Sequence, residues 1–394
     1  MSGTDTHRQW ERLADALRAE LVRRIAVAGM LTDPHWRRAF AEVPRHLFVP
    51  SYYRPGRSGR GHTLLTRDDP DPAGRARWLA GTYEDVPLIT RLRAGALVSS
   101  SSQPSLMAMM LEALEVSEGQ TVLEIGAGTG YNAALLAHRL GACAVTTVDL
   151  DGDIANAARE RLAAAGYADV TVVTGDGTQG CPYRAPFDRI MATCELTSVP
   201  APWLRQCRPG GLVIAPVAGG LVVLRVADAA HAEGRFLRTP AYFVALRRPG
   251  REPEVAQEPS REPDDAGTGG GQDERVRRTG TPPWVLDNDD FRFVMSLMLA
   301  DTAVTRAFGG RGATLVAADG SRAHVGSDGS VRIHGPRDLW AGVERAHDLW
   351  QREGRPRRER FGLTVDGIRQ RAWLDEPDGR YVWDLARSVT RGAA

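Results

Sequence analysis

The chain has 394 residues, with 50 Lys and Arg residues against 49 Asp and Glu residues, so it is long enough for more than one domain. This balanced charge excludes a protein built to coat nucleic acid or a membrane surface. No apolar run approaches the length of a membrane span, and the four cysteines form no C-x-x-C pair, which argues against a zinc site or a disulfide framework. We therefore predict a cytoplasmic protein without a metal site.

The first predicted elements are helices. Residues 8–50 carry apolar positions that are spaced for one buried face. Residues 53–79 are rich in Gly, Pro, Arg and Asp, so we predict a surface insertion there. The helices and this insertion form a predicted N-terminal segment over residues 1–96.

Residues 97–248 alternate between β-branched runs and helical patterns. The runs "TVLEIG" (121–126), "CAVTTVDL" (143–150) and "VTVVTGD" (170–176) predict strands, and a helical pattern follows each of the first two. This alternation predicts an α/β domain with a Rossmann-like parallel sheet that helices cover on both faces.

The composition changes again after this domain. Residues 249–283 have few aromatic or β-branched side chains and predict a linker. Residues 284–394 regain Trp, Phe and Met, which predicts a small appended C-terminal domain that serves substrate recognition or oligomerisation. Because the linker composition suggests few contacts between the two parts, a chain that stops near Pro249 is expected to fold.

A glycine loop lies between a predicted buried strand and a helix that begins near Tyr131. Gly126, Gly128 and Gly130 let the chain turn sharply and let a ligand lie against bare backbone, while the helix N-terminus offers N–H groups to an anion. The G-x-G-x-G spacing after Glu124 differs from the dinucleotide pattern, and it favours a nucleoside with an amino-acid carboxylate. It therefore predicts S-adenosylmethionine as the cofactor, the alternative being a structural turn in a domain that binds something else.

Two acidic residues lie at the ends of the next predicted strands. Asp149 is placed to accept hydrogen bonds from ribose hydroxyls, and Asp176 is placed to meet the adenine amine. The candidate cofactor-binding residues are Glu124, Gly126, Ala127, Gly128, Gly130, Asn132, Asp149, Leu150, Gly175, Asp176 and Gly177.

Several segments together resemble the protein-L-isoaspartate (D-aspartate) O-methyltransferase family. The segments are "VPRHLFVP" (43–50), "TYEDVPL" (82–88), "SQPSLMA" (102–108), "VLEIGAGTGYNAALLA" (122–137), "GDGTQG" with "APFDRI" (175–190) and "PGGLVIAPV" (209–217). Each is moderately specific, whereas all of them in order are highly specific. The resemblance covers about half of the chain and implies a Rossmann-like fold, S-adenosylmethionine, and methyl transfer to a carboxylate of an aspartyl-derived residue.

The same resemblance gives a role to the serine run 99–102. In the family, the serine directly before Gln-Pro or Ala-Pro lies beside the reacting carboxylate, and here that residue is Ser102. Ser101 is the second candidate catalytic residue, since a hydroxyl and nearby N–H groups can hold the carboxylate oxygen that does not react. The structural alternative is a helix N-cap, a role that we predict for Ser105.

The expected reaction needs little acid-base chemistry. An aspartyl-type carboxylate has a pKa of about 3.9 and is ionised at neutral pH, so we expect neither a catalytic triad nor a metal. The protein has to align the carboxylate with the methyl group and exclude water. The methyl ester then closes to a succinimide, whose hydrolysis gives aspartate or isoaspartate.

The chain departs from the repair enzyme of this family in its serine run, its insertion at 53–79 and its long region after Leu246. Added recognition surface suits an enzyme dedicated to one peptide. Family variants with an appended C-terminal region are associated with ribosomally synthesised, post-translationally modified peptides. We therefore favour dedicated modification of Asp in a constrained biosynthetic peptide, with general repair of L-isoaspartyl proteins as the alternative.

Two further classes of function are open to the sequence. A binding module that kept the cofactor fold is disfavoured by the intact glycine loop and its acidic residues. A small-molecule or nucleic-acid methyltransferase is disfavoured by the balanced charge, by the Ser-Gln-Pro motif and by the absence of a base-methylation signature. The expected partner is a peptide or protein that bears Asp or isoAsp, and no nucleic acid or membrane.

Overall fold

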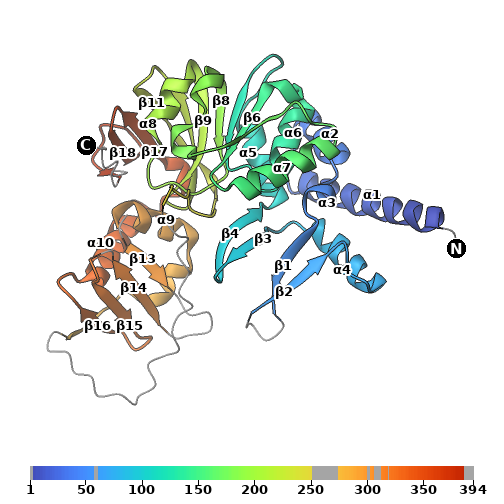
Figure 1. The fold of residues 1–394 in the computed structure, drawn as a ribbon. Helices are drawn as coiled ribbons and strands as arrows, with labels where there is room; N and C mark the ends of the chain where they lie inside the picture. Colours follow the sequence, from blue (N-terminus) through green and yellow to red (C-terminus); the bar gives the residue numbers. More distant parts are fainter. Residues whose placement is uncertain are drawn as a thin grey trace.

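The computed structural model describes residues 3–56, 61–250, 274–299, 302–305, 312–317 and 319–385. The described strands form a four-stranded sheet, a ten-stranded sheet and a five-stranded sheet. In Figure 1 the ten-stranded sheet lies at the top, and the smaller sheets lie below it. Within the described residues, no helix has both the length and the apolar content that a membrane crossing requires.

The N-terminal region begins with helices, as its apolar spacing predicted. They are α1 (Gly3–Val27), α2 (Pro34–Glu42) and α3 (Arg45–Phe48). Asp33 caps α2 because its carboxylate accepts hydrogen bonds from the N–H groups of His35 and Trp36. The buried face of α2 includes Trp36 and Phe40.

The segment predicted as a surface insertion contains regular elements that its composition did not indicate. β1 (Ser51–Pro55) and β2 (His62–Thr66) form an antiparallel pair, and α4 (Pro72–Thr82) follows. Trp78 and Leu79 of α4 are buried. The polar composition belongs to the exposed turns and faces of these elements, so it hid the few apolar residues that fix them to the core.

The four-stranded sheet is completed by β3 (Leu88–Arg93) and β4 (Ala96–Ser101), in the order β2-β1-β3-β4. Ser99, Ser100 and Ser101 therefore belong to a strand of this sheet and not to the predicted parallel sheet. Helix α5 (Pro104–Ala113) begins directly after the run and leads to the large sheet.

One half of the ten-stranded sheet is the predicted Rossmann-like core. Its strand order is β7-β6-β5-β8-β9, all parallel. The strands are β5 (Val122–Ile125), β6 (Val145–Asp149), β7 (Thr171–Thr174), β8 (Phe187–Ala192) and β9 (Cys207–Val217). The helices of this half are α6 (Tyr131–Leu140), α7 (Gly152–Ala164) and α8 (Ala201–Gln206), with short 3₁₀ turns at Ala142–Ala144, Gly177–Gln179 and Pro182–Arg184.

The other half of this sheet is antiparallel and corrects the predicted domain division. β10 (Gly220–Val226) and β11 (His231–Pro240) follow β9, and β11 pairs with β17 (Phe361–Asp366). β18 (Arg369–Leu374) and β19 (Val382–Asp384) form the edge. The last three strands of the predicted C-terminal domain therefore extend the ten-stranded sheet, because residues far apart in the sequence supply each other's backbone hydrogen bonds.

The five-stranded sheet contains the remainder of the appended region. Its order is β12 (Arg275–Arg278), β16 (Ser330–His334), β15 (Arg322–Val325), β14 (Ala313–Ala317) and β13 (Thr302–Thr305). Helices α9 (Asp289–Met298) and α10 (Leu339–Arg352) accompany it, with 3₁₀ turns at Pro283–Asp287 and Arg358–Arg360. The predicted linker thus includes a strand at Arg275–Arg278, while its residues 251–273 lie outside the described residues.

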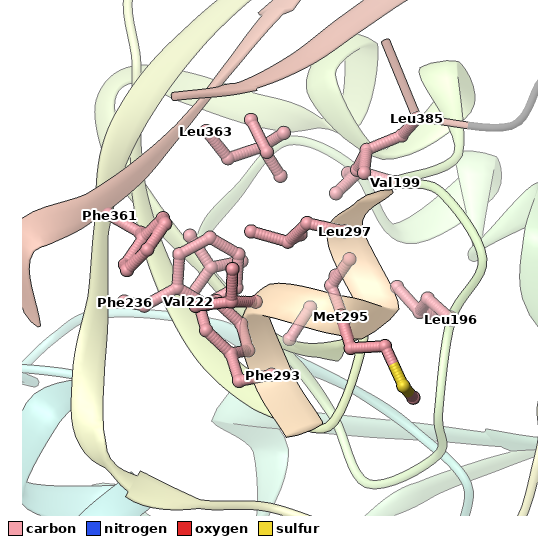
Figure 2. Packing of buried hydrophobic residues seen from close by; sticks show 14 of the residues in the cluster. Leu196, Val199, Val222, Phe236, Phe293, Met295, Leu297, Phe361, Leu363 and Leu385 are labelled. Atoms are coloured by element: carbon pink, nitrogen blue, oxygen red, sulfur yellow. The ribbon is translucent and has the colours of Figure 1, made fainter. Parts of the chain in front are cut away.

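Helix α9 joins the appended region to the ten-stranded sheet. Figure 2 shows its residues Phe293, Met295 and Leu297 among side chains of the large sheet and of the segment around Leu196. The Phe293 and Phe236 rings lie edge to face with their centroids 4.8 Å apart, and all of these residues belong to one buried cluster. The expectation of few contacts across residue 249 is therefore wrong.

Candidate active site

A cavity lies at the carboxyl ends of β5 and β6, which is where ligands bind in open α/β sheets. Three parts of the chain that the sequence singled out line it: the serine run, the glycine loop with the start of α6, and the end of β6. Residues 193–194 after β8 and residues 244–247 after β11 line it as well, together with Met107 and Gly177. The topology thus brings together segments that lie between Val98 and Arg247 in the chain.

The glycine loop has the backbone that only glycine adopts without strain. Gly126, Gly128 and Gly130 have φ values of 102°, 51° and 86°, in the left-handed region. A Cβ at Gly126 would lie 2.7 Å from Thr193 Oγ1. At Gly128 a Cβ would meet nothing closer than 3.5 Å, so a larger side chain there would fill ligand space without striking the protein.

Two polar side chains beneath this loop suit a cationic ligand. Glu124 is 1% exposed, and its carboxyl oxygens accept hydrogen bonds from Asn132 Nδ2 (2.7 Å) and Thr147 Oγ1 (2.6 Å). The Asn132 Oδ1 atom is buried without a hydrogen-bond partner, which is costly for an acceptor unless a ligand supplies a donor. Both residues line the cavity, and such acceptors fit the ammonium and sulfonium groups of S-adenosylmethionine.

The buried Glu124 gives the fold a pH dependence. Burial raises the pKa of Glu124 from 4.5 to about 7, so the folded chain keeps a proton that the unfolded chain releases. Stability therefore falls as the pH rises from about 4.5 to about 7, by on the order of 3 kcal/mol, and then levels off. We expect the melting temperature of wild type to fall more between pH 5 and pH 7.5 than that of Glu124→Gln, which has no such proton.

The comparison with the variant removes the contributions that both proteins share. The main shared contribution comes from Glu195, because burial raises the pKa of Glu195 to about 7 as well. The negative charge of Asp149 also raises the pKa of Glu124. Parallel pH slopes in wild type and variant would mean that Glu124 is ionised in the folded protein over this whole range.

Asp149 lies at the end of β6, as predicted, and its carboxylate is already engaged. Its Oδ2 accepts a hydrogen bond from Gly128 N (3.1 Å), and its Oδ1 accepts from Asp151 N (3.1 Å) and Arg247 Nη2 (3.2 Å). A carboxylate has about four acceptor positions, so about one remains. A ribose diol, which offers two donors, can therefore bind Asp149 fully only where Arg247 gives up its hydrogen bond.

The structure brings together most, but not all, of the predicted cofactor residues. Leu150 and Gly177 line the cavity with the loop, whereas Gly130, Gly175 and Asp176 are not part of its lining. The Asp176 carboxylate accepts a hydrogen bond from Thr178 N at 2.9 Å, so it caps the turn that follows β7. Its contact with adenine stays a prediction.

The serine run places its two candidate residues differently. Ser101 is 3% exposed, and its hydroxyl oxygen accepts hydrogen bonds from Arg45. Ser102 is partly exposed and lines the cavity, and within the described residues its hydroxyl has no hydrogen-bond partner. Of the two candidate serines, Ser102 is thus the one whose hydroxyl is available to a ligand.

The predicted cap at Ser105 is wrong. Helix α5 begins at Pro104, and Gln103, its N-cap residue, makes no capping hydrogen bond. The Ser105 N–H instead donates to Asp85 Oδ1 at 2.8 Å. The Asp85 carboxylate, from the "TYEDVPL" segment, therefore caps the helix. The sequence did not indicate this cap, because the donor and the acceptor are distant in the chain.

Residues 244–247 are the main part of the cavity that the sequence did not indicate. Arg247 forms ion pairs with Asp149 (3.2 Å) and Asp151 (3.7 Å). Leu246 lies beside Gly177, where an added Cβ would be 3.2 Å from Leu246 Cδ1. The resembling motifs end at residue 217, so no local signal marked this segment.

The Rossmann-like sheet, its glycine loop and the acid at the end of β6 are the arrangement expected of an S-adenosylmethionine-dependent methyltransferase. The comparisons with known proteins give the particular family. The model of the family described as "Protein-L-isoaspartate(D-aspartate) O-methyltransferase (PCMT)" matches residues 75–243. A protein-L-isoaspartate O-methyltransferase of Methanosarcina mazei is 36% identical over 211 residues, which are 53% of this chain and 74% of that protein.

A second relative with the same name, from Hyperthermus butylicus, is 34% identical over 252 residues, covering 60% of this chain and 90% of that protein. A solved structure named protein-L-isoaspartate O-methyltransferase has a TM-score of 0.50 and 23% identity, and the match covers 89% of this chain and 96% of that one. The chain belongs to the protein-L-isoaspartate O-methyltransferase family. It is a carboxyl O-methyltransferase with S-adenosylmethionine as its cofactor, as its sequence predicted.

Proposed function

We propose that the chain methylates an aspartyl-type carboxylate, that of an L-isoaspartyl residue in a peptide or protein. The observation that supports this most is the position of Ser102. Its hydroxyl lacks a partner among the described residues, and it lies in the same cavity as the glycine loop and Asp149. An acceptor carboxylate held there would lie within the site that binds the methyl donor.

The chain's own residues act by binding and orientation. Glu124, Asn132, the glycine loop and Asp149 hold the cofactor, which supplies an electrophilic methyl group when bound. The acceptor carboxylate is ionised at neutral pH, so no side chain has to remove a proton. The Ser102 hydroxyl donates a hydrogen bond to the carboxylate oxygen that does not react, and the cavity walls keep water away from the other oxygen.

The ester product then changes without help from the enzyme. The backbone nitrogen of the next residue in the substrate attacks the ester carbonyl, and methanol leaves with the proton of that nitrogen. The resulting succinimide opens with water to aspartate or isoaspartate. Mass spectrometry of an isoaspartyl peptide incubated with enzyme and cofactor tests this sequence, which requires a methyl ester first and a succinimide later.

Replacement of Ser102 by alanine is expected to leave cofactor binding intact and to lower kcat. Removal of one positioned donor costs about 10²–10³ in rate where the donor is critical, and here the adjacent serines favour the lower end or less. Methylation of an isoaspartyl peptide measures this loss. Ser198→Ala is the matched control, since Ser198 is a buried serine outside the cavity lining. If Ser102→Ala had an unchanged kcat and Ser101→Ala were inactive, the catalytic serine of the family would correspond to Ser101 in this chain.

A second candidate function is the modification of normal Asp in one dedicated biosynthetic peptide. The feature that favours this second function is the run of four serines, Ser99–Ser102, in the lining of the cavity. The appended region does not favour it by itself, because the match to the solved protein-L-isoaspartate O-methyltransferase covers 89% of this chain and therefore extends into that region. Similar rates on isoaspartyl residues in unrelated peptides would support general repair, whereas activity only on an Asp-containing precursor peptide encoded by a neighbouring gene would support the dedicated function.

A further inference from the structure

Arg45 is an arginine with no exposed surface, located behind the serine run. Its side chain is 0% exposed, and it lies in α3, within the "VPRHLFVP" segment. The site description above does not use it, because it does not line the cavity. A buried guanidinium has a high desolvation cost, so its partners are informative.

The Arg45 guanidinium connects the serine run, which lines the cavity, to the "TYEDVPL" segment (82–88). Toward the "TYEDVPL" segment, Nη1 donates to the carbonyl oxygens of Thr82 (2.9 Å) and Glu84 (3.1 Å), and Nη2 donates to that of Val86 (3.3 Å). Toward the serine run, Nη2 donates to the carbonyl oxygens of Ser101 (3.2 Å) and Ser102 (3.0 Å). The Ser101 hydroxyl accepts from Nε and from Nη2, both at 3.3 Å.

No carboxylate neutralises this charge at close range. Every hydrogen-bond acceptor of Arg45 is a carbonyl or hydroxyl oxygen, and within the described residues it forms no ion pair. Burial lowers the pKa of Arg45 to about 10, so the group stays charged at neutral pH. Its longer-range electrostatic neighbours are Asp85 and the tyrosines Tyr52, Tyr83 and Tyr131. A cation that carbonyl and hydroxyl oxygens solvate therefore lies behind the serine run, with the Asp85 carboxylate among its electrostatic neighbours but not hydrogen-bonded to it.

We propose that Arg45 is the positioning residue of the acceptor site. It fixes the backbone of Ser101 and Ser102 against residues 82–86, and its charge makes the floor beneath Ser102 attractive to a carboxylate. This inference rests on the proposed function, because it assigns Ser102 to the acceptor. Arg45 acts through Ser102 and does not itself touch the substrate.

The test is a double-mutant cycle of Arg45→Lys with Ser102→Ala. Lysine keeps the charge but loses the planar fork that reaches both segments. We expect the affinity for S-adenosylhomocysteine to stay within about twofold of wild type. We expect kcat on an isoaspartyl peptide to fall by about 10–100-fold, as for a small displacement of a reacting group. In the Ser102→Ala background the same change should cost less than about threefold, because the two residues act as a unit.

Arg358→Lys is the matched control. Arg358 is also buried, at 1% exposed, but it lies in the appended region and bonds to Asp290 Oδ1 (2.7 Å) and Asp289 O (2.7 Å). Its replacement should leave kcat unchanged at a temperature where the variant is folded. The role of Arg45 would be overturned if Arg45→Lys lowered kcat by the same factor in wild type and in Ser102→Ala. It would also be overturned if Arg358→Lys lowered kcat as much as Arg45→Lys.

Two other outcomes are also decisive. If Arg45→Lys does not fold, Ser101→Ala takes its place, because it removes the hydroxyl that accepts from Arg45. An unchanged kcat for Ser101→Ala, or a loss that persists in full in the Ser102→Ala background, would then overturn the proposal, and a loss of about tenfold that is absent from the Ser102→Ala background would support it. A folded wild type that binds S-adenosylhomocysteine but methylates no isoaspartyl peptide would overturn the proposed function and, with it, the role of Arg45.

Discussion

A chain that ends at Pro249 is expected to be insoluble or to melt without a cooperative transition. The truncation removes β17, which supplies the backbone partners of β11 from His231 to Arg235. It also removes α9, whose Phe293, Met295 and Leu297 belong to the buried cluster of the catalytic sheet. The remaining domain would expose this cluster and an unpaired strand edge, both of which promote aggregation.

Point variants give a graded form of the same test. Phe293 is 1% exposed and contacts Phe236 and Phe361 through its ring, so Phe293→Ala should cost about 3–5 kcal/mol of stability. Trp284, in the 3₁₀ turn that precedes α9, is 57% exposed, and Trp284→Ala should cost less than about 0.5 kcal/mol. Circular dichroism melts measure both. A soluble fragment of residues 1–249 with a cooperative melt and wild-type affinity for S-adenosylhomocysteine would contradict the description of one shared core.

Asp149→Ala is expected to weaken the binding of S-adenosylhomocysteine by at least about 100-fold. A hydrogen bond to a charged group contributes about 1.5–3 kcal/mol, and about 1.4 kcal/mol corresponds to a factor of ten. The variant also releases Gly128 N, which Asp149 holds in place. The loss of the ribose partner and the loosened loop therefore act in the same direction.

Calorimetry with S-adenosylhomocysteine measures this effect, and Asp153→Ala is the matched control. Asp153 is an exposed acid of the same segment that pairs with Arg91 at 3.0 Å and is not part of the cavity lining. Its removal should leave the affinity within about twofold, as expected for an exposed ion pair. Wild-type affinity in Asp149→Ala would contradict the assignment of the cofactor site.

The sequence predicted those parts of the structure that depend on neighbouring residues. The alternation of strands and helices from residue 121 predicted the parallel half of the large sheet, and the spacing of Gly126, Gly128 and Gly130 predicted the loop at its edge. In each case a strand, a turn and a helix follow one another directly, so the local pattern contains the information.

The remainder depends on contacts between distant residues. The pairing of β11 with β17 joins residues more than a hundred positions apart, and no periodicity reveals which strands will meet. The same holds for Asp85, which takes the capping role predicted for Ser105, and for Arg247, which reaches Asp149 from 98 residues away. Arg45 was visible only as part of a motif, since its partners are mostly backbone carbonyls that any sequence has.

The most direct test of the central claim is methyl transfer to a synthetic isoaspartyl peptide from S-adenosylmethionine labelled in its methyl group. The matched controls are the same peptide with normal Asp and the same peptide with Asn. We predict that label enters the isoaspartyl peptide and is released as methanol in mild base, which is the behaviour of a carboxyl methyl ester. A protein that binds the cofactor but transfers no base-labile label to any of these peptides, or places base-stable label on them, would contradict the account.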